Sequence, residues 1–210
     1  KAKEISGGKP VGVNIMVALK NYDAHVKASV EAGADVVISG AGLPVHLPEY
    51  VEGSGCKIAP IVSSEKAAQI ILRNWAKKFN RTADFIVIEG PKAGGHLGFK
   101  KEQIGQITDE EYNLEIKKII NTVKEYEEKY NQKIPVIIAG GVFTHNDICH
   151  AISLGAQGVQ IASRFVATDE CDADEKYKQA YINASDSDIE IVMSPVGMPG
   201  RAIRNKFVEF

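Results

Sequence analysis

The sequence contains no hydrophobic run approaching the roughly 20 residues that a membrane-spanning helix needs, and no recognisable signal peptide. Its charges nearly cancel, with 25 basic and 27 acidic side chains and a formal net charge of −2. A chain so close to neutral has no electrostatic footprint for nucleic acid or an anionic membrane surface. These absences predict a cytoplasmic protein with neither a nucleic-acid nor a membrane partner.

Cysteine is also scarce. The three cysteines, Cys56, Cys149 and Cys171, are widely spaced and odd in number. This pattern is typical of a reducing compartment, and it provides neither a disulfide framework nor the ligand spacing of a zinc site. No cysteine has a nearby histidine partner that would indicate thiol catalysis. We therefore expect neither a metal site nor a cysteine nucleophile.

Six apolar, β-branched runs recur along the chain, and helical segments separate them. The predicted strands are residues 11–17, 35–39, 58–62, 84–88, 134–139 and 158–161, and amphipathic helices are predicted over 22–32, 64–79, 110–130 and 145–154. The alternation is typical of βαβ units around a parallel sheet. Because the runs are apolar on both faces, helices are expected to cover the sheet. The predicted fold class is α/β, as a (β/α)8 TIM barrel.

The number of strands is smaller than a complete barrel requires. Six strands, or seven if residues 190–193 form one, are present, whereas such barrels typically have about 250 residues and eight strands. Residues 1–210 are therefore expected to form a single partial barrel domain, with two N-terminal βα units and a C-terminal tail outside it. A doubly wound open sheet is the alternative. No G-x-G-x-x-G motif follows a strand, so a Rossmann dinucleotide site has no support.

The segment IEGPKAGGHLG, residues 88–98, follows the fourth predicted strand. Barrel enzymes place their reactive side chains just past the carboxyl ends of strands. His96 has an imidazole that can exchange a proton at neutral pH, and Gly94 and Gly95 let backbone N–H groups approach a flat or anionic ligand. The alternative is a simple turn with a solvated histidine. A polar loop over residues 99–109 is expected to follow, where a lid could form.

Two further strand ends resemble a phosphate site. PVIIAGGV (135–142) and GAQGVQIASRF (155–165) match the last two barrel strands, whose loops bind phosphate in many (β/α)8 enzymes. The paired glycines allow a tight loop, and Ser163 adds a hydroxyl donor. The alternative is two tight βα turns. Arg164 is expected either to face the phosphate or to brace the rim against an acidic neighbour.

Four segments resemble the nitronate monooxygenase (2-nitropropane dioxygenase) family. In order along the chain, they are GVNIM, IEGPKAGGHLG, PVIIAGGV and GAQGVQIASRF. This family of FMN-dependent (β/α)8 flavoproteins includes the flavin-dependent enoyl-acyl-carrier-protein reductases. The resemblance implies that His96 is the catalytic histidine. It also implies that the FMN cofactor is bound by Asn14, Glu89, Ala93, Gly94, Gly95, Gly140, Gly141, Ala162 and Ser163.

The resemblance implies an FMN-dependent oxidoreductase that oxidises alkyl nitronates or nitroalkanes, both small molecules, with oxygen. The alternative is an NAD(P)H- and FMN-dependent reductase acting on an enoyl thioester of acyl carrier protein, which the sequence RAIRN at 201–205 slightly favours. A flavin-free phosphate-binding barrel, as an isomerase or a non-catalytic binder, is a third interpretation. A homodimer would be ordinary for this class.

Overall fold

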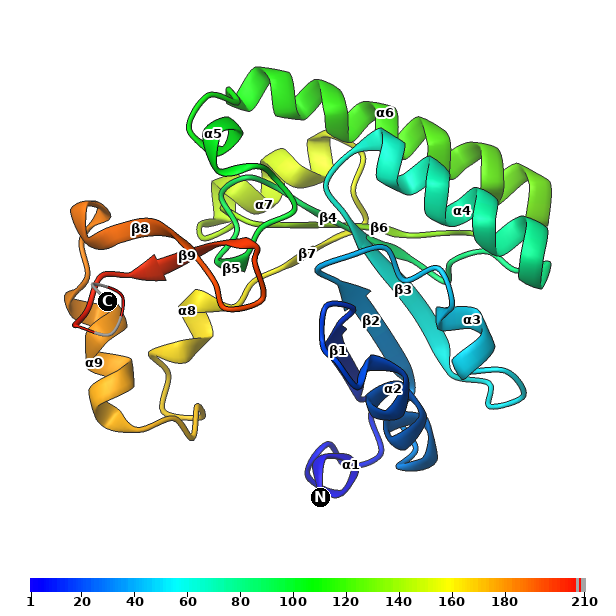
Figure 1. Ribbon diagram of the computed structural model, residues 1–210, viewed down its shortest axis with the longest axis horizontal. Coiled ribbons are helices and arrows are strands. Elements are labelled where there is room, and N and C mark those ends of the chain that lie inside the picture. The colour runs from blue at the N-terminus through cyan, green and yellow to red at the C-terminus, as the bar shows by residue number, and fades with distance from the viewer. Residues whose placement is uncertain (207, 209–210) are drawn as a thin grey trace.

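A curled sheet of six parallel strands forms the centre of the molecule (Figure 1). The computed structural model describes residues 1–206 and 208, so positions 207 and 209–210 of the predicted domain lie outside the described residues. In their order across the sheet, the strands are β1 (Gly12–Met16), β2 (Val36–Gly40), β3 (Lys57–Val62), β4 (Ile86–Glu89), β6 (Val136–Ala139) and β7 (Gly158–Gln160). All six predicted strands are confirmed, with ends that differ by at most two residues.

The strand order distinguishes the two predicted architectures. The six parallel strands lie side by side in the order in which the chain forms them, β1-β2-β3-β4-β6-β7, so the order never reverses. A doubly wound sheet needs such a reversal at its topological switch point, and that alternative is therefore wrong. An unreversed, curled parallel sheet is the arrangement of consecutive strands in a (β/α)8 barrel, and the described strands form an arc of this kind.

Four helices of nine or more residues pack beside the sheet: α2 (Tyr22–Glu31), α4 (Glu65–Phe79), α6 (Asp109–Tyr130) and α7 (His145–Ser153). In α4, Ser64 caps the first turn by accepting a hydrogen bond from the backbone N–H of Ala67. The buried residues of α4 follow helical spacing, at Ala68, Ile71, Leu72 and Trp75. Each large apolar side chain buried in this way contributes about 1.5–3 kcal/mol, so this stripe fixes the helix against the strands.

One type of side-chain hydrogen bond recurs where a helix leads into a strand. The side chains of Asp35, Asp84 and Gln157 accept hydrogen bonds from the backbone N–H groups of Val11, Ile58 and Val136 at 2.6, 2.9 and 2.7 Å. Each accepting residue precedes one strand and contacts the beginning of its neighbour. These hydrogen bonds join adjacent strands at their amino ends. The carboxyl ends of the strands are left free to carry longer loops.

A second, antiparallel sheet contains β5 (Gly95–His96), β9 (Pro199–Ile203) and β8 (Ile189–Met193), in that order. The strand expected at residues 190–193 therefore exists, but its prediction as a barrel strand is wrong because it pairs with β9 outside the parallel sheet. Figure 1 shows this hairpin beside the carboxyl ends of the strands, together with the segment that contains His96.

Four further helices and the 3₁₀ turn have three or four residues each: α1 (Ala2–Ile5), α3 (Leu47–Tyr50), α5 (Lys101–Ile104), α8 (Ser163–Val166) and η1 (Asp186–Asp188). The nine-residue helix α9 (Glu175–Asn183) lies between α8 and η1 in the chain. The expectation of a polar loop over 99–109 is wrong, since α5 lies within it. Ile104 is buried in a small cluster with Leu97 and Ala93. No helix in the described part of the chain is long and apolar enough to cross a membrane.

Candidate functional site

Two adjoining cavities lie at the carboxyl ends of the parallel strands. The first, of about 390 Å³, lies beside the loops that follow β4, β6 and β7 and beside β9. The second, of about 680 Å³, lies beside the loops that follow β2, β3 and β4. Both volumes fall within the range of about 300–1,000 Å³ that is usual for small-molecule sites. The carboxyl edge of this sheet is therefore shaped to hold a ligand.

The structure brings together most of the predicted site residues. Eight of the nine predicted cofactor positions line the 390 Å³ cavity: Glu89, Ala93, Gly94, Gly95, Gly140, Gly141, Ala162 and Ser163. His96 lines the 680 Å³ cavity instead. Asn14 lines neither of them, because it lies in the middle of β1, paired with Ile38, and not past the end of its strand.

Glu89 lines both cavities and so lies between them. It is the last residue of β4, and its backbone carbonyl accepts a hydrogen bond from the Tyr112 hydroxyl of α6 at 2.8 Å. Its carboxyl group forms no ion pair or side-chain hydrogen bond with the rest of the described chain. Burial without a compensating partner raises the pKa of Glu89 to about 7. This carboxyl can therefore gain or lose a proton near neutral pH.

The loops around the first cavity pack too closely to accommodate larger residues. Gly140 and Gly141 have φ angles of +88° and +76°, which side chains rarely adopt. A Cβ atom on Gly140 would lie 2.9 Å from the backbone nitrogen of Ala93. The loop after β6 can therefore lie against the loop after β4 only because residue 140 is glycine. Residues of both loops line the cavity.

Two guanidinium groups face the first cavity without a carboxylate partner in the described structure. Arg164 donates from Nη1 to the carbonyl of Phe143 at 3.0 Å, and its guanidinium lies 4.9 Å from the centre of the Phe143 ring. Arg201 donates from Nη2 to the carbonyl of Pro91 at 2.9 Å. The third cation, Lys92, is paired with Asp109 at 2.7 Å. The unpaired guanidinium groups make the cavity suitable for an anion.

Arg164 braces the rim through Phe143, and not through the expected acidic neighbour. Its contacts with Phe143 connect the loop after β6 to the beginning of α8, so it braces the rim through a carbonyl and an aromatic ring. It lines the cavity at the same time. The two loops predicted to bind phosphate are thus held together by this side chain.

The histidine segment is held in place by β9. Gly95 pairs with Arg201 and His96 pairs with Gly200, in antiparallel register. The backbone N–H of Leu97 donates to the carbonyl of Pro199 at 2.8 Å. His96 therefore lies in a short strand and not in a turn, and its half-buried side chain lines the second cavity. Its catalytic role stays a prediction.

Sequence reasoning did not assign a role to the 194–205 segment, which provides β9. Its Gly-Pro-rich composition indicates a loop, and two-residue strands such as β5 have no periodic signal.

The expectation that no histidine accompanies a cysteine is also wrong, since Cys149 Sγ lies 3.4 Å from His145 Nε2 on α7. That pair is exposed and lies outside both cavities.

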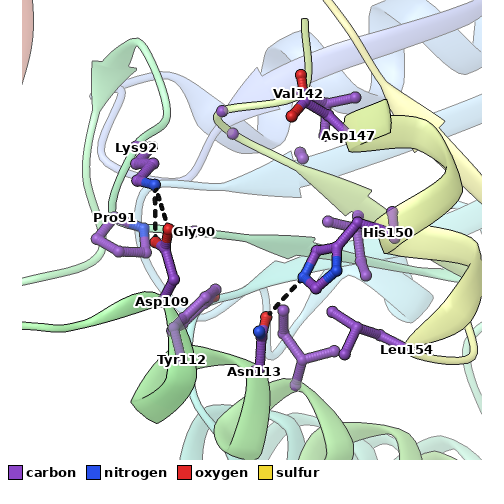
Figure 2. A pocket seen from close by; sticks show the side chains of 16 residues that line it. Gly90, Pro91, Lys92, Asp109, Tyr112, Asn113, Val142, Asp147, His150 and Leu154 are labelled. Atoms are coloured by element: carbon purple, nitrogen blue, oxygen red, sulfur yellow. Dashed lines mark hydrogen bonds and ion pairs between the residues drawn. The ribbon is translucent and has the colours of Figure 1, made fainter. Parts of the chain in front are cut away.

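A smaller cavity of about 150 Å³ lies between α6, α7 and the loop after β6 (Figure 2). Its polar groups already interact with one another. Figure 2 shows Lys92 paired with Asp109, and His150 Nε2 lies 3.3 Å from Asn113 Oδ1. This cavity backs onto the Gly140–Gly141 loop from the helix side of the sheet. We therefore assign the candidate site to the two cavities of about 390 and 680 Å³ at the carboxyl ends of the parallel strands.

The fold and site define an α/β protein with a curled parallel sheet and an anion-compatible ligand site at the carboxyl edge. The sequence model of the nitronate monooxygenase family matches residues 1–210, and the chain belongs to this family. A probable nitronate monooxygenase of Bacillus subtilis is 33% identical over 129 residues, which are 61% of this chain and 34% of that protein. The matched stretch therefore spans about a third of the length of that relative.

Two solved structures share the fold. FabK from Thermotoga maritima superposes with a TM-score of 0.76 and 31% identity, covering 99% of this chain and 60% of that one. A nitroalkane oxidase from Streptomyces ansochromogenes superposes with a TM-score of 0.75 and 21% identity, covering 99% of this chain and 66% of that one. The second likeness concerns the fold alone.

Proposed function

We propose that this chain is part of an FMN-dependent oxidoreductase that oxidises alkyl nitronates or nitroalkanes with oxygen. One observation carries the proposal: eight predicted cofactor positions line one cavity, and His96 lines the adjoining one. Membership of the nitronate monooxygenase family supports it. The first cavity is the proposed cofactor site, and the second is the proposed substrate site.

The residues of the first cavity fit FMN. Arg164 and Arg201 provide positive charge that no described carboxylate neutralises, as a phosphate dianion requires. Gly140 keeps the loop backbone open where a Cβ atom would collide with Ala93. Ser163 lines the same cavity and adds a hydroxyl group. We assign the phosphate to the part of the cavity lined by Gly140, Gly141, Ala162 and Ser163, within reach of the Arg201 guanidinium, and the flavin to the part lined by Glu89, Ala93, Gly94 and Gly95.

When bound, FMN would supply the redox chemistry by accepting electrons from the substrate and passing them to oxygen. The chain's own contribution is proton transfer and orientation. His96 is held by β9 beside the 680 Å³ cavity. Its imidazole would remove the acidic proton of a nitroalkane or donate a hydrogen bond to an oxygen of the nitronate. We expect the His96 imidazole to raise the rate about a hundredfold or more, which corresponds to a lowering of the activation free energy by about 2.7 kcal/mol or more.

Glu89 would separate the two ligands. It is partly buried between both cavities, and its carboxyl carries a proton for a large fraction of the time near pH 7. In the protonated form it donates a hydrogen bond, and in the ionised form it accepts one. We assign it to a hydroxyl group of the FMN ribityl chain.

A second candidate function is NAD(P)H-dependent reduction of an enoyl thioester carried by acyl carrier protein. The likeness to FabK at 31% identity favours it, as does the RAIRN sequence at 201–205. In that case NAD(P)H would enter the second cavity in place of a nitronate, and His96 would donate a proton to the substrate. The same residues serve both reactions, so the substrate has to be found by measurement.

We also propose that residues 1–210 belong to one FMN-binding barrel domain. The edge strands of the described sheet, β1 and β7, each have one unpaired side. Two further βα units before β1 would pair with both edges and close the barrel. The 60% coverage of the FabK chain is compatible with this arrangement.

The test is steady-state turnover of the FMN-reconstituted protein with each candidate substrate. Nitronate oxidation consumes oxygen without nicotinamide, whereas enoyl reduction consumes NAD(P)H without oxygen. We expect oxygen uptake with an alkyl nitronate and little NAD(P)H oxidation with an enoyl thioester. The opposite pattern would replace the first function by the second. Failure to bind FMN would contradict both.

A further inference from the structure

Arg201 makes little use of its hydrogen-bonding capacity within the protein. A guanidinium has five N–H donors, and the described structure gives Arg201 one hydrogen bond, from Nη2 to the carbonyl of Pro91 at 2.9 Å. Its Nε is buried and has no partner in the described chain. Buried donors are nearly always satisfied in folded proteins. Nε itself is not open to the cavity, but the Nη groups keep donors that no acceptor in the described chain takes, and the Arg201 side chain lines the cavity, so a ligand there can accept from them.

No acidic side chain in the described part of the chain accepts a hydrogen bond from Arg201. Glu89 is the one carboxyl among the described residues that line the 390 Å³ cavity, and it forms no ion pair with Arg201. Burial also lowers the pKa of Arg201, because the charged guanidinium loses water without gaining a counter-charge. An anion in the cavity would provide both the missing acceptor and the missing charge.

The backbone of Arg201 connects this cavity to the histidine. Arg201 pairs with Gly95, and the residue before it, Gly200, pairs with His96. The Arg201 side chain holds the carbonyl of Pro91 at the other end of the same segment. Residues 91–96 are thus held at both ends by Arg201 and its neighbour Gly200. A ligand that orders the Arg201 guanidinium would also order the segment that carries His96.

We propose that Arg201 binds a phosphate group in the 390 Å³ cavity and thereby positions the His96 segment for the reaction. The inference rests on the proposed function for the identity of the phosphate, which there belongs to FMN. Arg201 then acts on the substrate indirectly, as a positioning residue. Its two connections are the pairing of β5 with β9 and its hydrogen bond to Pro91.

The test compares FMN with riboflavin, which lacks the phosphate. Dissociation constants are measured by fluorescence for the wild-type protein, Arg201→Gln and a control, Arg204→Gln. Arg204 is a suitable control because it lies in the same segment, pairs with Glu190 at 2.6 Å and does not line the cavity. We expect Arg201→Gln to lose about tenfold or more of the preference for FMN over riboflavin, and Arg204→Gln to keep it. An unchanged preference in Arg201→Gln would overturn the inference.

Hydrogen exchange of residues 91–97 tests the positioning. FMN should slow exchange in this segment more than riboflavin does in the wild-type protein, and this difference should vanish in Arg201→Gln. If Arg201→Gln does not fold, Arg201→Lys replaces it, because lysine keeps the charge but cannot contact Pro91 and a phosphate through separate fork nitrogens. An undiminished exchange difference in the folded variant would refute the coupling.

Failure of the proposed function is distinguishable from failure of this inference. If the wild-type protein binds neither flavin, FMN is the wrong ligand, and inorganic phosphate becomes the probe. Thermal stabilisation by inorganic phosphate that Arg201→Gln abolishes would then support a phosphate contact from another source. Equal stabilisation of both proteins would overturn the contact. If wild-type protein binds FMN and Arg201→Gln retains the full preference for it, only the inference fails.

Discussion

Gly140 and Ala93 pack so closely that no side chain fits between them. A Cβ atom added to Gly140 would lie 2.9 Å from both the Cβ atom and the backbone nitrogen of Ala93. The φ angle of +88° at Gly140 adds backbone strain to any such substitution. We predict that Gly140→Ala lowers the free energy of unfolding by about 1–3 kcal/mol and weakens FMN binding more than tenfold.

The measurement for Gly140→Ala is urea unfolding together with FMN titration. Gly105→Ala is the matched control, because no atom lies within 4 Å of its added Cβ and its φ angle of −91° suits any residue. Gly105→Ala should bind FMN as the wild-type protein does. Normal FMN affinity in Gly140→Ala would mean that the loop after β6 does not form the phosphate site.

His96 is the residue on which turnover should depend. We predict that His96→Asn leaves FMN bound and lowers turnover by about a hundredfold or more, because asparagine fills a similar space but cannot transfer a proton. The control is His25→Asn, an exposed position on α2. Both variants are compared by flavin absorbance and by steady-state rate. Retained activity in His96→Asn would return His96 to a structural role.

Glu89 should make stability depend on pH in the direction opposite to that of a salt-bridged acid. Its pKa rises from an ordinary value of 4.5 to about 7 in the folded protein because of burial. Below pH 4.5 both states are protonated, so the group has no effect. Between pH 4.5 and 7 the unfolded state releases the proton first, and stability falls as pH rises. Above pH 7 the buried, ionised carboxylate lowers the free energy of unfolding by its full amount, up to about 3 kcal/mol.

Glu89→Gln therefore should match wild-type stability at pH 4 and exceed it at pH 8 by about 1–3 kcal/mol. Urea unfolding of the FMN-free protein at the two pH values measures this difference. Glu102→Gln, at an exposed position of α5, controls for removal of a negative charge near the cavities. A Glu89→Gln advantage that does not change with pH would show that its carboxyl is ionised normally.

Arg164 should affect the cofactor more than the fold. Its hydrogen bond and its stacking on Phe143 join the loops after β6 and β7 at the surface. We predict that Arg164→Ala weakens FMN binding several-fold to tenfold and changes the free energy of unfolding by about 1 kcal/mol or less. Calorimetric titration and thermal unfolding measure the two effects. A large loss of stability with unchanged FMN affinity would contradict this assignment.

The parallel sheet could be predicted from the sequence because its strands are short apolar runs separated by amphipathic helices with recognisable caps. Ser64, for example, marks the beginning of α4, and it does cap that helix. The antiparallel sheet could not be predicted in the same way. The two residues of β5 become a strand only because Arg201 and Gly200, more than a hundred positions later, pair with them.

The candidate site was predictable where a residue type has a local reason to be present. Gly140 and Gly141 need positive φ angles, and Glu89 ends a buried strand in a polar side chain. Asn14 lies within β1, whose end is two residues further on, so its proposed contact with the cofactor stays a prediction. The contribution of Arg201 depends on contacts that are distant in sequence, so no local pattern could indicate it.

The most direct test of the central claim is an anaerobic absorption spectrum of the FMN-reconstituted protein, recorded before and after addition of an alkyl nitronate. A parallel sample receives NADPH or NADH. We predict a visible flavin band that bleaches with the nitronate, is unaffected by nicotinamide and returns when oxygen is admitted. Bleaching by nicotinamide alone would favour the enoyl reductase. Absence of a flavin band after reconstitution would contradict the assignment of these cavities to a flavin enzyme.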